Sequence, residues 1–370
     1  MSARSAVRIG SLELANPVMP ASGCFGPELG QLIDLNQVGA LVTKTIFFGP
    51  RSGNPAHRLA ETYGGMLNSV GIPSPGVEVF LTDILPRYTT WQPPTIVSIG
   101  GLTVGEYFEV ADRLAGVPDI DALEVNISCP NLEAGGLEIG AVPATVEEVL
   151  RGVVDRSTVP VIAKLTPNVT SIADIARAAE AGGATAISAI NAVMGMEIDL
   201  RTRRAEIGAT TAGWSGPAIK PLALRMVWQA ANAVSLPVIG IGGIATAEHA
   251  LEFILAGRAR YRSARPRSLT RIRWCAWLPT STSGWWSTRL TSSTSWARCR
   301  SVRRSTSWRA APATSSRSAA AAGAISPTTR LLQEGTLRRA PNSGTTHAVR
   351  IGTAACAPNS RSYPRALTSD

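Results

Sequence analysis

Short apolar runs alternate with amphipathic stretches along residues 1–257 of this chain. The apolar runs are typical of buried parallel strands, and the amphipathic stretches have helical spacing. The strands are expected at Pro17–Ala21, Ala40–Lys44, Thr95–Ile99, Ala122–Ile127, Val159–Leu165, Ala184–Ile190 and Pro237–Ile241. The helices are expected at Val104–Leu114, Val146–Asp155, Ile172–Ala181, Pro221–Val234 and Ala247–Leu255. This order favours repeated βα units around a parallel sheet.

A repeating βα pattern with seven strands predicts the α/β fold class, as a barrel of the TIM (β/α)8 type. We expect strand eight and its helix to be missing from it. An open doubly wound sheet is the alternative. The run Val7–Leu14 alternates apolar and polar residues and turns at Gly10-Ser11, so it predicts a hairpin that closes the floor of the barrel.

The composition changes abruptly after Gly257. Residues 258–370 hold 20 Arg, no Lys and two acids, Glu334 and Asp370, for a net charge of +18. The first 257 residues then hold 36 − 20 = 16 basic and 26 − 2 = 24 acidic residues, a net charge of −8. Six of the nine Trp also follow residue 257. We therefore predict two regions, a barrel over residues 1–257 and a disordered or non-native tail over residues 258–370.

Polar residues gather where the predicted strands end. In a barrel these ends face one mouth, where active sites lie. The residues are Ser22, Lys44, Thr45, Ser98, the run Asn126–Asn131, Lys164, Asn191, Gly242 and Gly243. A single lysine in a strand is often a surface residue, but two at strand ends within apolar runs favour a functional role. Gly242-Gly243 follows the seventh strand, so its bare backbone amides could bind a phosphate, although a tight turn is the alternative.

Cys129 lies in the most informative motif, Asn126-Ile127-Ser128-Cys129-Pro130-Asn131. A thiol at the end of a strand could give or take a proton, and the amides around it could hold a planar ligand. The alternative is a buried cysteine that packs as a small apolar residue. The five cysteines show no CxxC pair and no metal spacing, so we expect no metal site, and we expect Cys24 to be a packing residue.

Several classes of protein are excluded by what the sequence lacks. It has no GxGxxG fingerprint and no GxxxxGK[ST] motif, which argues against a Rossmann site and a P-loop. No apolar run is long enough to span a bilayer, and the first residues lack the apolar segment of a signal peptide. We therefore expect a cytoplasmic protein without a membrane partner.

The combined motifs resemble the class 1 dihydroorotate dehydrogenases, soluble flavin-dependent barrel enzymes of pyrimidine synthesis. The resemblance runs almost continuously from Val7 to Gly257. It rests on Ala21–Gly26, Thr43–Thr45, Asn68–Ile72, Asn126–Asn131, Lys164–Pro167, Asn191–Met196, Ser215–Pro221 and Gly242–Ile244. Gly135-Gly136 and Ile198–Arg204 resemble the 1B subclass, which works with a second subunit that carries FAD and an iron–sulfur cluster and passes electrons to NAD.

The resemblance implies an FMN cofactor at the mouth of the barrel. The residues expected to bind it are Ser22, Lys44, Thr45, Asn126, Lys164, Ile190, Gly216, Gly242 and Gly243. Lys164 would stabilise negative charge on the reduced flavin. Cys129 would be the base that removes a proton from C5 of dihydroorotate while a hydride leaves C6 for the flavin.

The resemblance also implies a set of residues that bind dihydroorotate or orotate. They are Lys44, Asn68, Ser69, Val70, Gly71, Ile72, Asn126, Asn131, Asn191 and Ala192. Lys44 would meet the carboxylate, and the asparagines would hold the ring by its amide and carbonyl groups. Ala192 stands where the family usually has Thr, which removes one hydrogen bond to the substrate.

The tail departs from this resemblance, because the family continues after Ala256-Gly257 with a strand that ends in Gly-Thr. Back-translating Ala259–Cys275 and shifting the frame by two bases yields such a strand and turn. We therefore hypothesise a frameshifted tail. A natural arm that binds nucleic acid through Arg and Trp is the competing reading, and we favour no nucleic-acid partner. A single clean reading frame through codon 258 in several isolates would contradict the frameshift.

The sequence thus predicts a catalytic subunit that oxidises dihydroorotate to orotate, as a homodimer or as a heterotetramer with an electron-transfer subunit. Two alternatives remain open. One is a related flavin barrel that acts on another dihydropyrimidine, such as dihydrouracil. The other is an inactive frameshifted product, with the edges of strands one and seven unpaired.

Overall fold

A computed structural model describes residues 6–128, 130–131, 137–257 and 271–274 of the chain. The chain divides into two compact units, Met1–Ser307 and Trp308–Asp370, and all described residues lie in the first. Cys129 and most of the predicted tail lie outside the described residues. The domain boundary expected at residue 257 therefore stays a prediction.

A parallel sheet of eight strands forms the centre of the fold, in the order β3-β18-β17-β12-β11-β8-β7-β4. The strands are β3 (Val18–Pro20), β4 (Leu41–Val42), β7 (Thr95–Ile99), β8 (Ala122–Asn126), β11 (Val161–Leu165), β12 (Ala186–Ala189), β17 (Val238–Ile241) and β18 (Arg271–Trp274). The Gly39 N–H donates to the Val18 carbonyl over 2.7 Å, which joins β3 to the segment leading into β4. The sheet is a barrel, as predicted, and the open doubly wound alternative is wrong.

The eighth position of the sheet is filled, which corrects our prediction that strand eight is missing. β18 pairs in parallel with β17 on one side and with β3 on the other. Strand pairing uses main-chain N–H and C=O groups, so a segment can complete the ladder whatever its side chains are. The edges of β3 and β17, which we expected to be unpaired, are therefore paired. The residues after Trp274, where we expected no helix, lie outside the described part.

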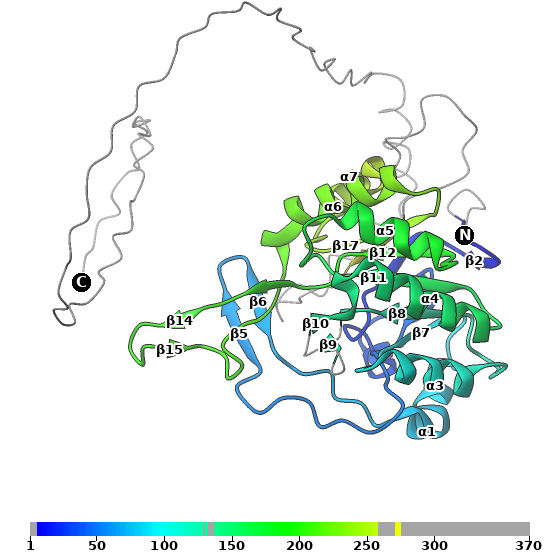
Figure 1. Ribbon diagram of the computed structural model, residues 1–370, viewed down its shortest axis with the longest axis horizontal. Helices are drawn as coiled ribbons and strands as arrows, with labels where there is room; N and C mark the ends of the chain where they lie inside the picture. The colour runs from blue at the N-terminus through cyan, green and yellow to red at the C-terminus, as the bar shows by residue number, and fades with distance from the viewer. Residues whose placement is uncertain (1–5, 129, 132–136, 258–270, 275–370) are drawn as a thin grey trace, which may run out of the picture. The chain divides into compact units, whose positions relative to one another are not determined.

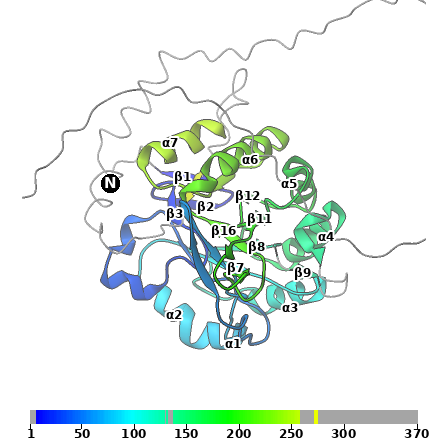
Figure 2. The ribbon, with the colours of Figure 1, turned by 90° about the vertical axis from the view of Figure 1, so that its left-hand side faces the viewer.

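Helices surround the sheet (Figure 2). They are α1 (Val77–Val79), α2 (Leu85–Tyr88), α3 (Val104–Leu114), α4 (Pro143–Arg156), α5 (Ile172–Ala181), α6 (Lys220–Ala233) and α7 (Ala247–Ala256). A π-helical turn, η3 (Phe80–Ile84), joins α1 to α2, and the 3-10 turns are η1 (Pro27–Gln31), η2 (Leu35–Gln37), η4 (Ile139–Ala141) and η5 (Pro217–Ile219). Thr103, Ser171 and Thr246 cap α3, α5 and α7 by accepting a hydrogen bond from a first-turn N–H. None of the described helices is long and apolar enough to cross a membrane.

Two apolar clusters divide the core along the alternation of each strand. On β8, Leu123 and Val125 face outward and pack with the helices. Ala122 instead faces into the barrel, where it packs with Ile162, Ala186 and the hairpin of β1 (Val7–Ile9) and β2 (Leu12–Leu14). The predicted hairpin at the barrel floor is therefore confirmed. Since this interior cluster ends below the middle of the strands, the interior above it is left to polar side chains.

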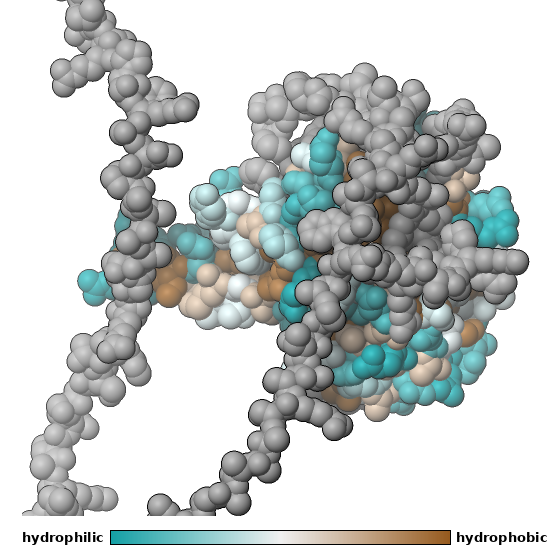
Figure 3. Space-filling view, turned by 90° about the horizontal axis from the view of Figure 1, so that it is seen from above, coloured by the Kyte–Doolittle hydropathy of each residue, from teal (hydrophilic) through white to brown (hydrophobic). Residues whose placement is uncertain are grey.

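A second, antiparallel sheet projects from the barrel as an arm (Figure 1). Its order is β13-β16-β6-β5, with β5 (Leu59–Thr62), β6 (Gly65–Asn68), β13 (Val193–Gly195) and β16 (Ala212–Ser215). The hairpin of β14 (Ile198–Asp199) and β15 (Arg204–Ala205) extends it further. Met194, Met196, Ile198 and Leu200 are exposed along its length, and Figure 3 shows brown patches there. The predicted strand list did not include this arm, because its strands are short and carry no long apolar run.

Cys24 follows β3 and packs beside Phe25 and Leu35. It is also disulfide-bonded, which corrects our reading of it as a packing residue alone. The other four cysteines lie outside the described residues.

Candidate active site

The carboxyl ends of the barrel strands meet at one mouth, and the predicted polar residues gather there. Lys164 lies on β11, directly between Asn126 on β8 and Ser188 on β12 in the strand register. The Lys164 Nζ donates to Ser22 Oγ over 2.9 Å and lies 4.0 Å from Glu124 Oε1. Only 5% of Lys164 is exposed. The structure thus holds an ammonium group inside the mouth, where a cation interacts more strongly with a negative group than it would in bulk water.

Asn126 is the centre of a buried amide network. Its Nδ2 donates to Thr45 Oγ1 over 3.3 Å, and its Oδ1 accepts from Asn191 Nδ2 over 3.0 Å. Thr45 in turn shares a 2.9 Å hydrogen bond with Ser98. These contacts join the ends of β4, β7, β8 and β12. Asn126 is therefore fixed by neighbours on both sides, and its orientation is set before any ligand arrives.

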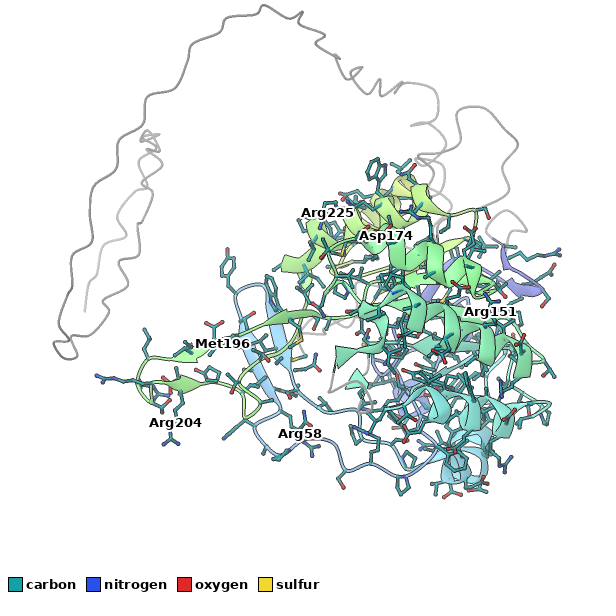
Figure 4. The ribbon with its side chains drawn as sticks, viewed as in Figure 1. Arg58, Arg151, Asp174, Met196, Arg204 and Arg225 are labelled. Atoms are coloured by element: carbon teal, nitrogen blue, oxygen red, sulfur yellow. The ribbon has the colours of Figure 1, made fainter. Side chains whose placement is uncertain are left out.

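Lys44 provides the second cation at the mouth. The Lys44 side chain keeps contact with solvent, but partial burial of its ammonium and, second, the charge of Arg58 lower its pKa below the usual 10.5. Figure 4 labels Arg58, which lies on the loop leading into β5. Two cations so close together repel each other, and an anionic group between them would relieve the repulsion. This part of the mouth therefore suits a carboxylate.

The predicted substrate loop, Asn68–Ile72, leaves the end of β6 and is braced by the segment around Asn54. The Asn54 N–H donates to the Val70 carbonyl over 3.1 Å, and Asn54 Nδ2 donates to Ser69 Oγ over 2.8 Å. Gly71 and Ile72 both have left-handed backbone, with φ of 72° and 44°. A positive φ at a β-branched residue is rare and points to a constrained, functional segment.

Asn191 and Ala192 lie between Asn126 and the substrate loop. The Asn191 Oδ1 accepts from the Ala192 N–H over 2.8 Å. A Cβ built on Gly213 would lie 2.7 Å from the Ala192 Cβ, and Asn68 Nδ2 donates to the Gly213 carbonyl over 3.2 Å. Gly213 on β16 therefore connects the two groups of predicted substrate residues, so the arm contributes one wall of the site.

The glycine side of the mouth, formed by Gly216, Gly242 and Gly243, has bare backbone. Their φ angles are 114°, 121° and 67°. A Cβ on Gly243 would lie 2.7 Å from the Lys220 backbone nitrogen and 2.9 Å from the Gly216 carbonyl. Ile190, which is buried, borders Gly242. Such a cradle of backbone amides at the late strands of a barrel fits a phosphate group.

Two predicted residues are only partly covered by the structure. Cys129 lies outside the described residues. Asn131 is described as backbone alone, in β9 (Pro130–Asn131), which pairs with β10 (Leu137–Glu138). Their predicted roles therefore stay predictions. Ser128, just before Cys129, has a backbone N–H that donates to Asn126 Oδ1 over 3.3 Å, which ties the start of this loop to the amide network.

Several residues at the mouth were missed by sequence reasoning. Glu124 and Ser188 lie inside the barrel on β8 and β12, and Glu124 Oε2 accepts from Ser188 Oγ over 2.8 Å. Asn168 braces the Ala192 carbonyl and the Met194 N–H, at 3.3 and 2.9 Å. Arg58 acts on Lys44, as described above. Glu124 could have been found by the argument used for Lys164, since it is an ionisable residue within an apolar strand.

The fold and the mouth together define the class of protein, an α/β-barrel enzyme with a cofactor site at the carboxyl ends of its strands. Residues 4–261 match the dihydroorotate dehydrogenase family. The chain therefore belongs to this family of flavin-dependent oxidoreductases of pyrimidine biosynthesis.

Curated relatives agree with this assignment. The three described below are each named dihydroorotate dehydrogenase B (NAD(+)), catalytic subunit. The protein from Alkaliphilus oremlandii is 54% identical over 253 residues, which are 68% of this chain and 83% of the relative. That from Desulforudis audaxviator is 53% identical over 259 residues, 70% and 84% of the two chains. That from a Geobacillus strain is 46% identical over 256 residues, 69% and 82%.

Proposed function

We propose that this chain oxidises dihydroorotate to orotate with FMN bound at the barrel mouth. The observation that carries the proposal is the pairing of two unlike features there. One is a set of interlocked amides and ammonium groups, centred on Asn126 and Lys164. The other is a glycine cradle with no room for side chains. The first suits a planar ring with a carboxylate, and the second suits the phosphate of a cofactor.

FMN would be held by the two sides of the mouth together. Gly216, Gly242 and Gly243 would surround its phosphate, and Lys164 would lie beside its ring, supported by the contact with Ser22. Thr45, Asn126, Lys44 and Ile190 would complete the binding set, as the resemblance implies. When bound, the flavin supplies the group that accepts a hydride from C6 of dihydroorotate. The protein orients that ring and places positive charge beside it.

Dihydroorotate would bind between the substrate loop and the amide network. Lys44 would meet its carboxylate, with the Arg58 charge close by. Asn68, Ser69, Val70, Gly71 and Ile72 would line one side of the ring, and Asn126, Asn131, Asn191 and Ala192 the other. A site built from buried amides rejects analogues that leave those amides unpaired. The carboxylate-binding cations favour dihydroorotate over dihydrouracil, which carries no carboxylate.

Cys129 would remove the proton from C5 as the hydride leaves C6. A thiol can serve as a base near neutral pH when its surroundings lower its pKa. The motif around it supports this role, because Asn126 and Ser128 tie the preceding loop to the mouth. The proton then leaves the thiol to solvent as orotate is released.

The electron acceptor would be a partner subunit that carries FAD and an iron–sulfur cluster and delivers electrons to NAD. The curated relatives are named as catalytic subunits of an NAD(+)-linked enzyme, which supports a partner of this kind. A homodimer or a heterotetramer would follow. A cytoplasmic location stays a prediction.

For the tail, we keep the hypothesis that the reading frame is shifted after Gly257. The family match ends at residue 261, close to the change in composition, which supports a boundary there. The alternative of an inactive product is tested by the experiment that follows. Sequencing the locus tests the frame itself.

The proposal is tested by expressing the full chain and measuring flavin absorbance, then adding dihydroorotate without oxygen. We expect a yellow protein whose absorbance bleaches with dihydroorotate and not with dihydrouracil. Cys129→Ser should keep the flavin but slow bleaching by about 10²–10⁴-fold. A protein that binds no flavin, or one that dihydrouracil bleaches equally well, would contradict the proposal.

A further inference from the structure

Glu124 is a carboxylate with an unusual position inside the barrel. It lies in the middle of β8 and is 0% exposed. Glutamate is almost never fully buried unless it is paired. Below it on the same interior face, Ala122 belongs to the apolar floor cluster, and above it Asn126 belongs to the mouth. Glu124 therefore marks the boundary between the apolar floor and the polar mouth.

The partners of Glu124 come from the two neighbouring strands. Its Oε2 accepts a 2.8 Å hydrogen bond from Ser188 Oγ, and its Oε1 lies 4.0 Å from Lys164 Nζ. In the register of β8 and β11, Lys164 pairs with Asn126, and Glu124 lies one interior position nearer the floor. The carboxylate thus approaches the ammonium group from below, while Ser22 accepts its hydrogen bond from the side.

Stability alone does not explain this pair. Two charges removed from water cost several kcal/mol of desolvation each, and apolar residues of similar volume are commonly as stable or more so. The interiors of such barrels are dominated by branched apolar residues, as the floor of this one is. A buried charged pair at this level, facing the mouth, therefore points to a role in the site.

We propose that Glu124 is a positioning residue that keeps the Lys164 ammonium protonated and directed toward the mouth, and that Ser188 fixes the carboxylate that does so. The part of this inference that concerns the cofactor rests on the proposed function, in which Lys164 lies beside the flavin. Glu124 itself contacts neither cofactor nor substrate in this proposal. It acts through the charge and the place of Lys164.

The use of lysine in this chain supports the proposal and makes it testable. The whole sequence contains three lysines, Lys44, Lys164 and Lys220, against 33 arginines. The structure places Lys44 and Lys164 at the mouth, whereas the Lys220 backbone lies against Gly243 and its amine donates to Glu252 on α7. Lysine is a compact charge that can lose its proton, whereas arginine is a planar fork that stays charged. With only three lysines, the amine reactivity of each can be read separately.

The experiment is competitive acetylation of the full chain, read by peptide mass spectrometry, for wild type, Glu124→Gln and Ser188→Ala. Only a neutral amine reacts. Without the carboxylate, the protonated form of Lys164 loses its counter-charge, so we expect its acetylation to rise about tenfold in Glu124→Gln. Ser188→Ala keeps the carboxylate but frees it to move, and should give a smaller rise of about two- to threefold. Lys44 and Lys220 serve as internal references and should change little.

Two results would overturn the proposal. Unchanged acetylation of Lys164 in Glu124→Gln would mean that the Glu124 carboxylate does not keep the Lys164 amine protonated. An equal rise at all three lysines would mean that the substitution merely loosens the fold. Because this test needs no flavin, it remains decisive even if the wild-type chain binds none, an outcome that would instead contradict the proposed function.

A second readout concerns the bound flavin. If Glu124 keeps Lys164 protonated, Glu124→Gln leaves less positive charge beside the ring, which disfavours its more negative reduced form. We expect Glu124→Gln to bind reduced over oxidised flavin about tenfold less favourably than wild type does, a fall in midpoint potential of about 30 mV for a two-electron couple. A potential equal to that of wild type would contradict the effect on the cofactor.

Discussion

The two sides of the barrel mouth are built by opposite means. On one side, side chains from β8, β11 and β12 interlock through hydrogen bonds around Asn126 and Lys164. On the glycine side, Gly216, Gly242 and Gly243 leave the backbone bare. The first side presents side-chain groups to a ligand, and the second presents main-chain groups where a side chain would clash with the protein. They should therefore fail in different ways, by unpaired polar groups on one side and by steric clash on the other.

The largest effect is expected from Lys164→Met. It removes the cation beside the proposed flavin, and loss of such an electrostatic group lowers kcat by about 10²–10³-fold. It also leaves Glu124 buried without its counter-charge, which costs about 3–5 kcal/mol of unfolding free energy. The double variant Lys164→Met with Glu124→Gln should recover most of that stability but none of the activity. Denaturant unfolding and turnover of both variants measure this, and a double variant as unstable as the single one would contradict it.

On the glycine side, Gly243→Ala should act by clash. Its φ of 67° is left-handed, and a Cβ there would lie 2.7 Å from the Lys220 backbone nitrogen. We expect a loss of about 1–3 kcal/mol in stability and at least about tenfold weaker flavin binding, measured by thermal unfolding and flavin titration. Gly49→Ala is the matched control, since a Cβ there meets nothing within 4 Å. Equal losses of stability and flavin binding in Gly243→Ala and Gly49→Ala would contradict the proposal that Gly243 must lack a side chain.

The amide network should fail by loss of partners. Asn126→Ala removes the groups that meet Thr45 Oγ1 and Asn191 Nδ2, both at the mouth. A buried polar group left without its partner costs about 1–3 kcal/mol, and the KM for dihydroorotate should rise with it. The control is Asn232→Ala on the surface of α6, where Nδ2 donates only to the Trp228 carbonyl and a change within about 0.5 kcal/mol is expected. Similar losses at both positions would argue against a network at the mouth.

The contrast between the two sides also explains how much the sequence could predict. Strand β7 and helices α3 and α5 have the bounds that their periodicity predicts. Lys164, Asn126 and Gly243 were found because each interrupts or ends an apolar strand. Arg58 and Asn54 were missed because they lie in a loop without periodicity, and only the folded chain brings them to Lys44 and Ser69.

The error at strand eight has a different physical cause. Side-chain pattern predicts strands because one face is usually buried. Main-chain pairing does not require that pattern, so Arg271–Trp274 can lie between β17 and β3 without an apolar alternation. The eighth strand could therefore not have been predicted from the residues that form it.

The pH dependence of substrate binding should report on Lys44 and on the neighbouring charge of Arg58. Burial and the Arg58 charge lower the pKa of Lys44, so its ammonium loses its proton at a lower pH than a free lysine does. The KM for dihydroorotate should then rise as pH increases through that lowered pKa. Arg58→Gln removes the second cause, so the rise should move to higher pH, whereas Arg58→Lys should keep the wild-type profile. The same pH profile of KM in wild type and both variants would show that Arg58 does not influence the protonation of Lys44.

The smallest expected effect is a gain in substrate affinity. It tests whether the interlocked side lacks one hydrogen bond to the substrate. Ala192 stands beside Asn191 and lies close to Gly213, where a Cβ would come within 2.7 Å of the Ala192 Cβ. Ala192→Thr adds a hydroxyl that could pair with the substrate ring, and one such hydrogen bond contributes about 0.5–1.5 kcal/mol. The KM for dihydroorotate should fall about two- to tenfold with kcat unchanged, while Ala192→Val, with the same shape but no hydroxyl, should not lower it. If valine lowered the KM as much as threonine did, packing against Gly213 rather than hydrogen bonding would limit binding on this side of the mouth.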